Sequence, residues 1–214
     1  MPQVSFTAWV EQVGSGQALG SFPTDTVPAL AARPDQGDRI YAAKQRPADK
    51  PLILMGATLE DLLPYVQGAD ADVRQWRQLT DRHWPGALTL VLPASPLLPP
   101  AINPQNTGTI GLRVPDHPLA RHLLAHTGPL ATTSANRSGQ PPLETMAAIE
   151  ASFPEVFTLA PAALAALYQE WGTPAPAPDQ VQGSGLPSTV VGWQGSGWQV
   201  LRAGAISLAA LEGA

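Results

Sequence analysis

The sequence predicts an α/β fold built on a mixed, open sheet with flanking helices. Short apolar runs alternate with longer segments whose apolar residues recur at helical spacing, which is typical of layered α/β domains. Near the C-terminus, residues 188–193 and 198–201 form two apolar runs joined by a Gln-Gly-Ser-Gly turn, which predicts a hairpin. A chain of 214 residues can bury one good core, so we expect a single domain spanning residues 1–214.

In the N-terminal half, apolar periodicity and the positions of proline and glycine define the expected elements. The alanine-rich stretch between Thr26 and Lys44 is expected to be helical, and Pro47 lies just beyond its end. Gly86 opens an apolar, β-leaning run, and a loop with five prolines follows it. The expected helices are residues 6–13, 38–45, 58–65 and 71–82, and the expected strands are residues 18–22, 52–55 and 86–92.

The C-terminal half continues the alternation. Pro118 opens a helix at the position where its missing N–H costs least, and Ser207 can cap a final short helix. Residues 172–185 are rich in proline, glycine and alanine and are expected to be mobile. The expected strands before the hairpin are residues 109–114, 130–134 and 156–159, and the expected helices are residues 118–125, 143–151 and 162–171.

The composition excludes several classes of protein. A net charge of −5 argues against broad nucleic-acid binding, which needs a basic face, although it permits a local basic pocket. The absence of cysteine excludes disulfides, a thiolate nucleophile and a zinc ribbon. We find no secretory signal pattern and no apolar run long enough to span a membrane, so a cytoplasmic protein without a membrane contact is expected.

The cations of this acidic chain are concentrated in residues 21–55. Both lysines of the chain, Lys44 and Lys50, lie there together with three arginines. A point charge at Lys44 and a planar fork at Arg46 suit phosphate and carboxylate groups, so this stretch predicts an anion site. The alternative is a solvated helix end, where the helix dipole also favours cations.

Three further polar turns lie at the ends of predicted strands, where ligands collect in open α/β sheets. They are centred on Asp25, on Ser134 and Asn136, and on Ser188, and each is rich in hydroxyl or amide side chains. Ordinary Asx or ST turns and polar loops are the competing interpretation. Arg113 and Arg202 each end a predicted strand; they line the same anion cavity, or they are simply snorkelling.

Several familiar sites are missing from the sequence. Neither lysine is preceded by the glycine of a P-loop, and no Gly-x-Ser-x-Gly nucleophile elbow occurs. His122 and His126 are four residues apart, but without a third ligand pattern we interpret them as surface histidines and expect no metal centre.

The polar turns occur in a fixed order that resembles the YrdC-like family of threonylcarbamoyl-AMP synthases in its single-domain form. The K-x-R pair at Lys44 and Arg46 and the S-x-N pair at Ser134 and Asn136 carry most of the likeness. The matching segments are residues 22–27, 44–47, 50–53, 84–89, 112–118, 133–139, 187–191 and 201–204. The resemblance implies a twisted, YrdC/RibB-like sheet curved around a concave, positively charged cavity.

The resemblance also implies a reaction. L-Threonine, bicarbonate or CO2, and ATP as substrate would give threonylcarbamoyl-AMP and pyrophosphate, a nucleotidyl transfer in which Mg²⁺ shares the triphosphate charge. A downstream threonylcarbamoyl-transferase complex would then modify tRNA, with at most a weak RNA contact here. By residue, Lys44 and Arg46 would be catalytic; Lys44, Arg46, Thr89, Ser134, Asn136 and Arg202 would bind ATP; and Thr24, Arg113, Thr132 and Ser188 would bind threonine.

The chain differs from the family pattern at four positions. Pro28 and Ala29 replace a Tyr-Gly pair, Met55 replaces a histidine, and Gly192 replaces an acidic residue. These differences favour the alternative of a nucleotide- or RNA-binding relative without synthase activity. A third candidate, a sugar-phosphate enzyme, would need an acidic metal cluster, and the few paired acids are better explained by helix capping and solvation.

Overall fold

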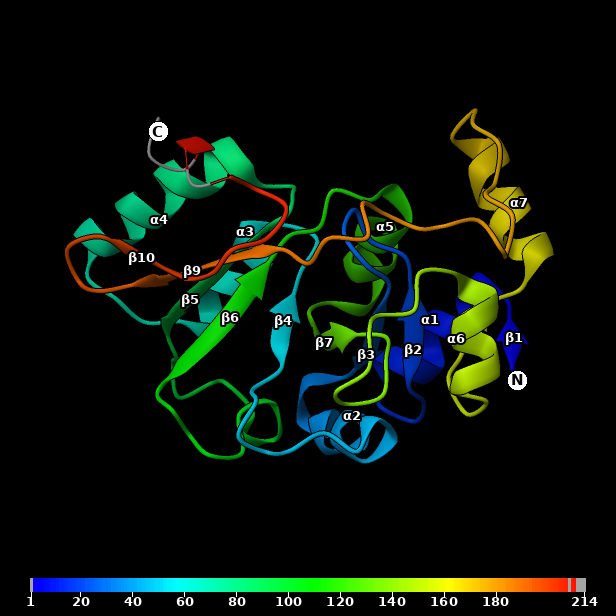
Figure 1. Cartoon of the computed structure of the whole chain (residues 1–214), viewed down its shortest axis with the longest axis horizontal. Coiled ribbons are helices and arrows are strands. Elements are labelled where there is room, and N and C mark those ends of the chain that lie inside the picture. The colour runs from blue at the N-terminus through cyan, green and yellow to red at the C-terminus, as the bar shows by residue number, and fades with distance from the viewer. Residues whose placement is uncertain (1, 208, 211–214) are drawn as a thin grey trace.

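The computed structural model describes residues 2–207 and 209–210 (Figure 1). Eight of its strands form one sheet in the order β10-β9-β5-β6-β4-β7-β3-β2, and β1 (Gln3–Val4) pairs in parallel with β8 (Thr158–Leu159) beside it. The sheet strands are β2 (Gly20–Phe22), β3 (Ala29–Ala32), β4 (Ile53–Met55), β5 (Leu88–Pro93), β6 (Thr109–Arg113), β7 (Leu130–Ser134), β9 (Thr189–Trp193) and β10 (Trp198–Arg202).

Parallel and antiparallel pairs occur in the same sheet. β4 runs parallel to β6, and β5 runs parallel to β9, whereas the other neighbours are antiparallel. The predicted mixed sheet is therefore confirmed, and so is the C-terminal hairpin of β9 and β10.

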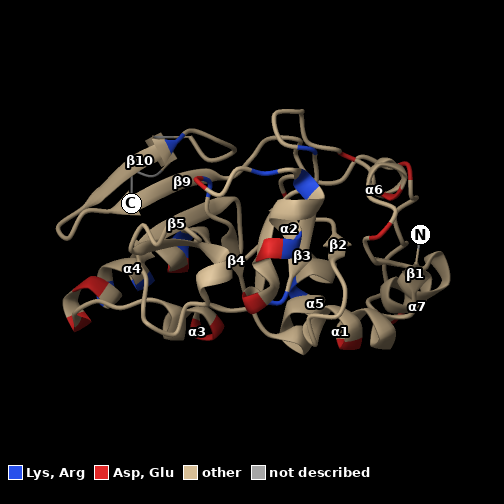
Figure 2. Ribbon diagram, turned by 90° about the horizontal axis from the view of Figure 1, so that it is seen from below, with Lys and Arg blue, Asp and Glu red and all other residues tan. Residues whose placement is uncertain are grey.

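Helices flank the sheet, and those in the described part of the chain agree with most of the predicted ones. The α-helices are α1 (Phe6–Gly14), α2 (Gly37–Lys44), α3 (Leu59–Leu62), α4 (Asp70–His83), α5 (Pro118–Thr127), α6 (Met146–Ser152) and α7 (Pro161–Glu170). The short 3-10 turns are η1 (Pro34–Gln36), η2 (Leu63–Tyr65) and η3 (Pro100–Ile102). Acidic residues are spread over several helices, among them α1, α2, α3, α4 and α6, and over the loops, as Figure 2 shows.

The prediction that the alanine-rich stretch after Thr26 is helical throughout is wrong for its first part. Residues 29–32 form β3, which lies between β7 and β2, and the helix starts only at Gly37. Pro28 and Pro34 bracket the strand and prevent a continuous helix. All four β3 residues are buried, because Ala29 and Ala31 pack in one core cluster and residues 30 and 32 pack in another.

Two core clusters lie on opposite faces of β3. One contains Trp9 of α1 with Leu119 and Leu123 of α5, and the other contains Trp76 of α4 with the leucines of β5 and β6. The indole Nε1 of Trp9 donates a hydrogen bond of 3.0 Å to the carbonyl oxygen of Phe157. Its ring lies directly over Gly20, where a Cβ atom would overlap it, so only glycine permits this packing.

Three details of the C-terminal half differ from the expectation or extend it. The predicted strand at residues 156–159 shortens to β8, which pairs with the unpredicted β1. Residues 172–185 form no helix or strand and cross back over the protein, where Ala147 N donates to Pro178 O; their mobility stays a prediction. Ser207 Oγ accepts a hydrogen bond of 3.3 Å from Ala210 N, as the predicted cap requires, and residues 209–210 are helical. Residues 208 and 211–214 of the predicted final helix lie outside the described residues.

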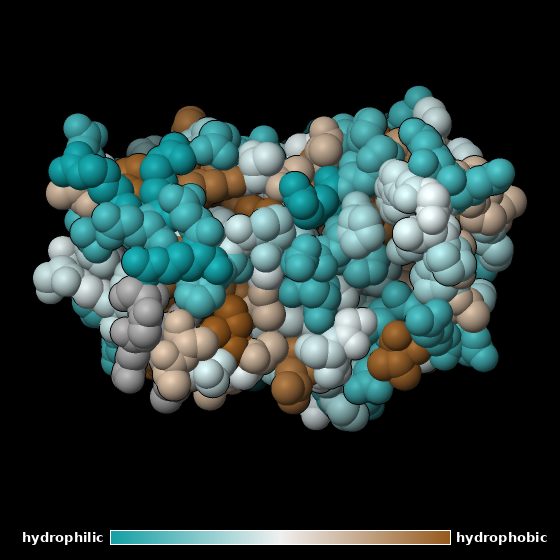
Figure 3. Space-filling view, turned by 90° about the horizontal axis from the view of Figure 1, so that it is seen from above, coloured by the Kyte–Doolittle hydropathy of each residue, from teal (hydrophilic) through white to brown (hydrophobic). Residues whose placement is uncertain are grey.

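Among the described residues, the longest and most apolar helices fall short of what a membrane span requires. On the face shown in Figure 3, hydrophobic side chains form separate small patches between hydrophilic ones. In the described part of the chain, the exposed large hydrophobic residues are Leu97, Val181, Leu186, Val200 and Leu201.

Candidate functional site

A cavity of about 420 Å³ lies over the middle strands of the sheet. The strand register explains its floor: Ala29 is paired with Ser134, and Ile53 is paired with Thr132, so these side chains share one face of β3, β4 and β7. Met55 continues the same face along β4. The floor is therefore apolar at one end and carries hydroxyl groups at the other.

Three arginines from distant parts of the chain line this cavity, namely Arg46, Arg113 and Arg202. The described lining contains no aspartate or glutamate. Arginine forks bind carboxylate and phosphate groups in two-point contacts, so this lining suits an anionic ligand. The predicted positive potential of the cavity stays a prediction, although its residues agree with it.

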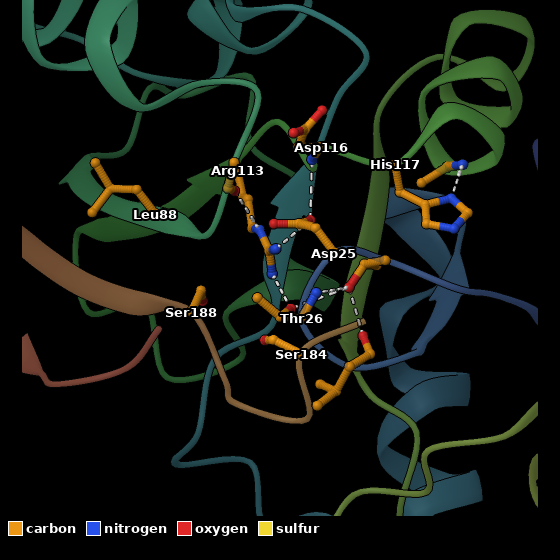
Figure 4. Close-up of polar contacts among 12 residues, drawn as sticks. Asp25, Thr26, Leu88, Arg113, Asp116, His117, Ser184 and Ser188 are labelled. Carbon is orange, nitrogen blue, oxygen red and sulfur yellow. Dashed lines mark hydrogen bonds and ion pairs between the residues drawn. The ribbon is translucent and has the colours of Figure 1, made fainter. Parts of the chain in front are cut away.

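Arg113 is held rigidly at the edge of the cavity (Figure 4). Its side chain is 3% exposed and forms an ion pair of 2.7 Å with Asp25, which is 17% exposed. Its Nη1 donates to Thr26 Oγ1 at 2.7 Å, and its Nε donates to Gly86 O at 3.0 Å. Burial lowers the pKa of Arg113, whereas Asp25 opposes that shift. Three of the five guanidinium N–H groups are used in these contacts, which leaves two for a ligand.

The turn that contains Asp25 is fixed from within by Thr24. Its fully buried Oγ1 donates to Val27 O at 2.7 Å and accepts from Thr26 N at 3.1 Å. Because its own hydrogen is used, Thr24 Oγ1 acts as the acceptor for Thr26 Oγ1 at 3.1 Å. Thr24 thus shapes the turn, and Thr26 is the threonine that lines the cavity.

Residues 182–188, here named the strap, lie across this turn. Ser184 N donates to Asp25 O, and Gly185 N donates to Thr26 O, each at 3.0 Å. Gly183 has a φ of +75° and lies so close to the turn that a Cβ atom would overlap the carbonyl oxygen of Thr26. The strap therefore connects the Asp25 turn with Ser188 on the other side of the cavity.

Ser188 and Arg202 form the wall supplied by the C-terminal hairpin. Arg202 Nη2 donates to Ser188 O at 2.6 Å and to Ser188 Oγ at 3.3 Å. Behind them, the fully buried Thr89 shares a hydrogen bond of 2.8 Å with Ser188 Oγ. Burial lowers the pKa of Arg202.

Lys44 lies beneath the opposite wall and is 1% exposed. Its ammonium Nζ donates to Ser134 O, to Asn136 O at 2.6 Å and to Asn136 Oδ1 at 3.0 Å. Burial, with a smaller contribution from Arg46, lowers the pKa of Lys44 to about 7. Lys44 thus contacts the protein itself, at the inner side of the turn that Ser134 and Asn136 present to the cavity.

Arg46, two residues after Lys44, points into the cavity and not under the loop. The left-handed conformation of Gln45, with a φ of 52°, ends α2 and turns the chain so that Arg46 reaches the cavity. Its Nε donates to Lys50 O at 2.9 Å and its Nη2 to Pro51 O at 3.1 Å. Within the described contacts Nη1 donates to no protein atom, so it is available to an anion.

The fold brings most of the ten predicted site residues together. Seven of them line the cavity: Arg46, Arg113, Thr132, Ser134, Asn136, Ser188 and Arg202. Lys44, Thr24 and Thr89 lie directly behind that lining and bond to it. Sequence reasoning passed over Asp25 as a partner of Arg113, and over Thr26, which lines the cavity next to the predicted Thr24. Asp25 and Thr26 lie in the same predicted turn as Thr24, which was the signal in the sequence. The sequence does not show which of these side chains points into the cavity.

The described residues contain no group of three or more His, Cys, Asp or Glu side chains arranged to hold a metal ion. His122 and His126 lie on α5, where His126 Nδ1 contacts His122 O at 2.8 Å.

The mixed open sheet and the arginine-lined cavity above its central strands together define the class: a ligand-binding α/β protein.

Known proteins share this sequence and this fold. The Sua5/YciO/YrdC family model, described as "Telomere recombination", matches residues 15–163. The chain belongs to this family. It is 38% identical over 151 residues to a threonylcarbamoyl-AMP synthase from Chromohalobacter salexigens, an alignment covering 69% of this chain and 80% of that protein.

Two further relatives are longer than the part they share with this chain. A Bacillus subtilis threonylcarbamoyl-AMP synthase is 42% identical over 128 residues, which cover 56% of this chain and 35% of that protein. The crystal structure of P. abyssi Sua5 complexed with L-threonine superposes with a TM-score of 0.78 and 28% identity. That alignment covers 97% of this chain and 56% of the Sua5 chain.

Proposed function

We propose that this chain is a threonylcarbamoyl-AMP synthase that condenses L-threonine, bicarbonate or CO2, and ATP. The observation that carries the proposal is the convergence of three arginines and several hydroxyl groups on one cavity, in a chain whose relatives bear that name. A cavity of about 420 Å³ lies within the range of small-molecule sites, roughly 300–1,000 Å³. The alternative of a binding module without synthase activity is not favoured, because the relatives are synthases.

The proposed reaction needs charge neutralisation and positioning more than a nucleophilic residue. The threonine amine attacks CO2 and loses a proton, which gives a carbamate. A carbamate oxygen then bonds to the α-phosphorus of ATP while the bond to the bridging oxygen of pyrophosphate breaks, so the step is a nucleotidyl transfer. Both reactants are anions, and the cavity arginines offset their repulsion.

The roles proposed for the side chains rest on their places in the cavity lining and on the N–H groups that the arginines leave unused. We assign Arg113 to the threonine carboxylate, with Ser188 and Thr132 beside it, and Arg46 to the triphosphate. Ser134, Asn136 and Arg202 would contact the nucleotide. Thr24 and Thr89 support this set from behind.

The described cavity lining offers no carboxylate ligand for Mg²⁺. We therefore propose that Mg²⁺ enters as part of the MgATP substrate, held by phosphate oxygens. The product would pass to a threonylcarbamoyl-transferase complex that acts on tRNA, with at most a weak RNA contact by this chain, and we propose a cytoplasmic location for these steps.

Pyrophosphate release tests the proposal. Wild-type protein should release pyrophosphate only when threonine, bicarbonate and ATP are all present. Arg46→Ala should lose most of this activity, because it removes charge-assisted contacts to a polyanion. Arg74→Ala is the matched control, since Arg74 is exposed on α4 and lies outside the cavity lining. Background release from folded wild-type protein with all three substrates would refute the function.

A further inference from the structure

We propose that Lys44 is a positioning residue: its ammonium holds residues 134–140 in the shape that receives the nucleotide, and it makes no contact with phosphate. The inference rests on the proposed function only in assuming that the cavity binds a nucleotide. The inference gives Lys44 and Arg46 different roles, although the two residues belong to one short motif.

The contacts of Lys44 leave no donor for a ligand. An ammonium has three N–H groups and no acceptor. All three are matched by oxygens of one loop: Ser134 O, Asn136 O and Asn136 Oδ1. The side chain is 1% exposed and is absent from the cavity lining, whereas Arg46 belongs to that lining.

The loop in turn depends on these bonds. Asn136 Oδ1 accepts from Ser134 Oγ at 2.6 Å as well as from Lys44, and Asn136 Nδ2 donates to Gln140 O at 2.7 Å. Ser138 N donates back to Lys44 O at 3.0 Å. Ser134, Asn136 and Gln140 all line the cavity. Lys44 is therefore the internal connection between the end of α2 and one wall of the site.

The charge on Lys44 matters for this role. A neutral amine offers only two N–H groups, so one of the three loop oxygens would lose its donor on deprotonation. Arg46 is the charged group that lowers the pKa of Lys44 besides burial, and Arg137 on the loop donates to Ala43 O, next to Lys44, and to Ser152 O. Burial and Arg46 lower the pKa of Lys44 to about 7, so the connection is sensitive to pH near neutrality.

Calorimetric binding of adenosine and of ATP tells whether Lys44 positions the loop or contacts phosphate. Adenosine has no phosphate, so a positioning residue should affect it as much as ATP. Lys44→Met should weaken adenosine and ATP by the same factor, roughly tenfold, because buried acceptors lose a charged donor. Arg46→Ala should weaken ATP far more than adenosine. A Lys44→Met protein that binds adenosine normally would overturn the inference, whether or not its ATP affinity falls.

A second measurement uses the wild-type protein and needs no variant to fold. Adenosine affinity should fall as the pH rises through about 7, the pKa of Lys44, while Arg46 stays charged throughout. A flat profile between pH 6 and 9 would overturn the inference. Failure of the synthase assay with this adenosine pattern intact would refute the proposed function and leave the inference on Lys44 standing, whereas wild-type protein that binds no nucleotide would refute both.

Discussion

Removal of the Asp25 carboxylate is the perturbation whose cost follows most directly from the structure. Asp25 Oδ1 accepts from Arg113 Nη2 at 2.7 Å and from Asp116 N at 3.0 Å. Asp25→Ala leaves the guanidinium of Arg113 buried without a counter-charge, while its bond to Thr26 survives. Breaking one side of a buried ion pair costs about 3–5 kcal/mol, and because Asp25 is partly exposed we expect about 3 kcal/mol.

For a chain of this length, such a loss corresponds to a Tm lower by roughly 6–12 °C. Thermal and urea unfolding measure it, at low and at high salt, because a buried pair is screened little. The surface pair of Arg33 and Asp35, with 42% and 48% exposure, is the matched control. Asp35→Ala should change Tm little. Equal effects of the two substitutions, or a loss for Asp25→Ala that vanishes in high salt, would refute the reasoning.

Two further predictions concern the strap and α5. Gly183→Ala should raise the KM for threonine and lower the free energy of unfolding, because a Cβ atom would meet the carbonyl oxygen of Thr26. Gly139→Ala is the control: Gly139 also has a positive φ, of +82°, but open space around it. That substitution should cost only the backbone strain of about 1–2 kcal/mol. Equal effects at both glycines in steady-state kinetics and urea unfolding would contradict this. His117 Nδ1 accepts from Ala120 N at 3.4 Å at the start of α5, and burial lowers the pKa of His117. Its folded-state pKa lies below the unfolded value, so the unfolded chain takes up the extra proton and stability should fall as the pH drops below about 6.5. His117→Asn keeps a capping acceptor that does not titrate and should flatten that fall; an unchanged urea profile at pH 5 to 7 would count against the role.

The sequence alone determined the fold class and predicted seven of the residues that line the cavity. Apolar period and proline placement predict helices such as α5 and the C-terminal hairpin, because these features act over a few residues. The short motifs at Arg46 and at Ser134 to Asn136 identify the cavity walls, because grouped cations and hydroxyls in an acidic chain have few other uses.

Only the tertiary structure decided how those residues divide their work. β3 shows no sequence period because both of its faces are buried, and that burial comes from elements far away in the chain. Lys44 and Arg46 look equivalent in sequence, but the left-handed Gln45 between them sends one side chain under the loop and the other into the cavity. The direction of a side chain depends on packing across the molecule, and local sequence does not encode it.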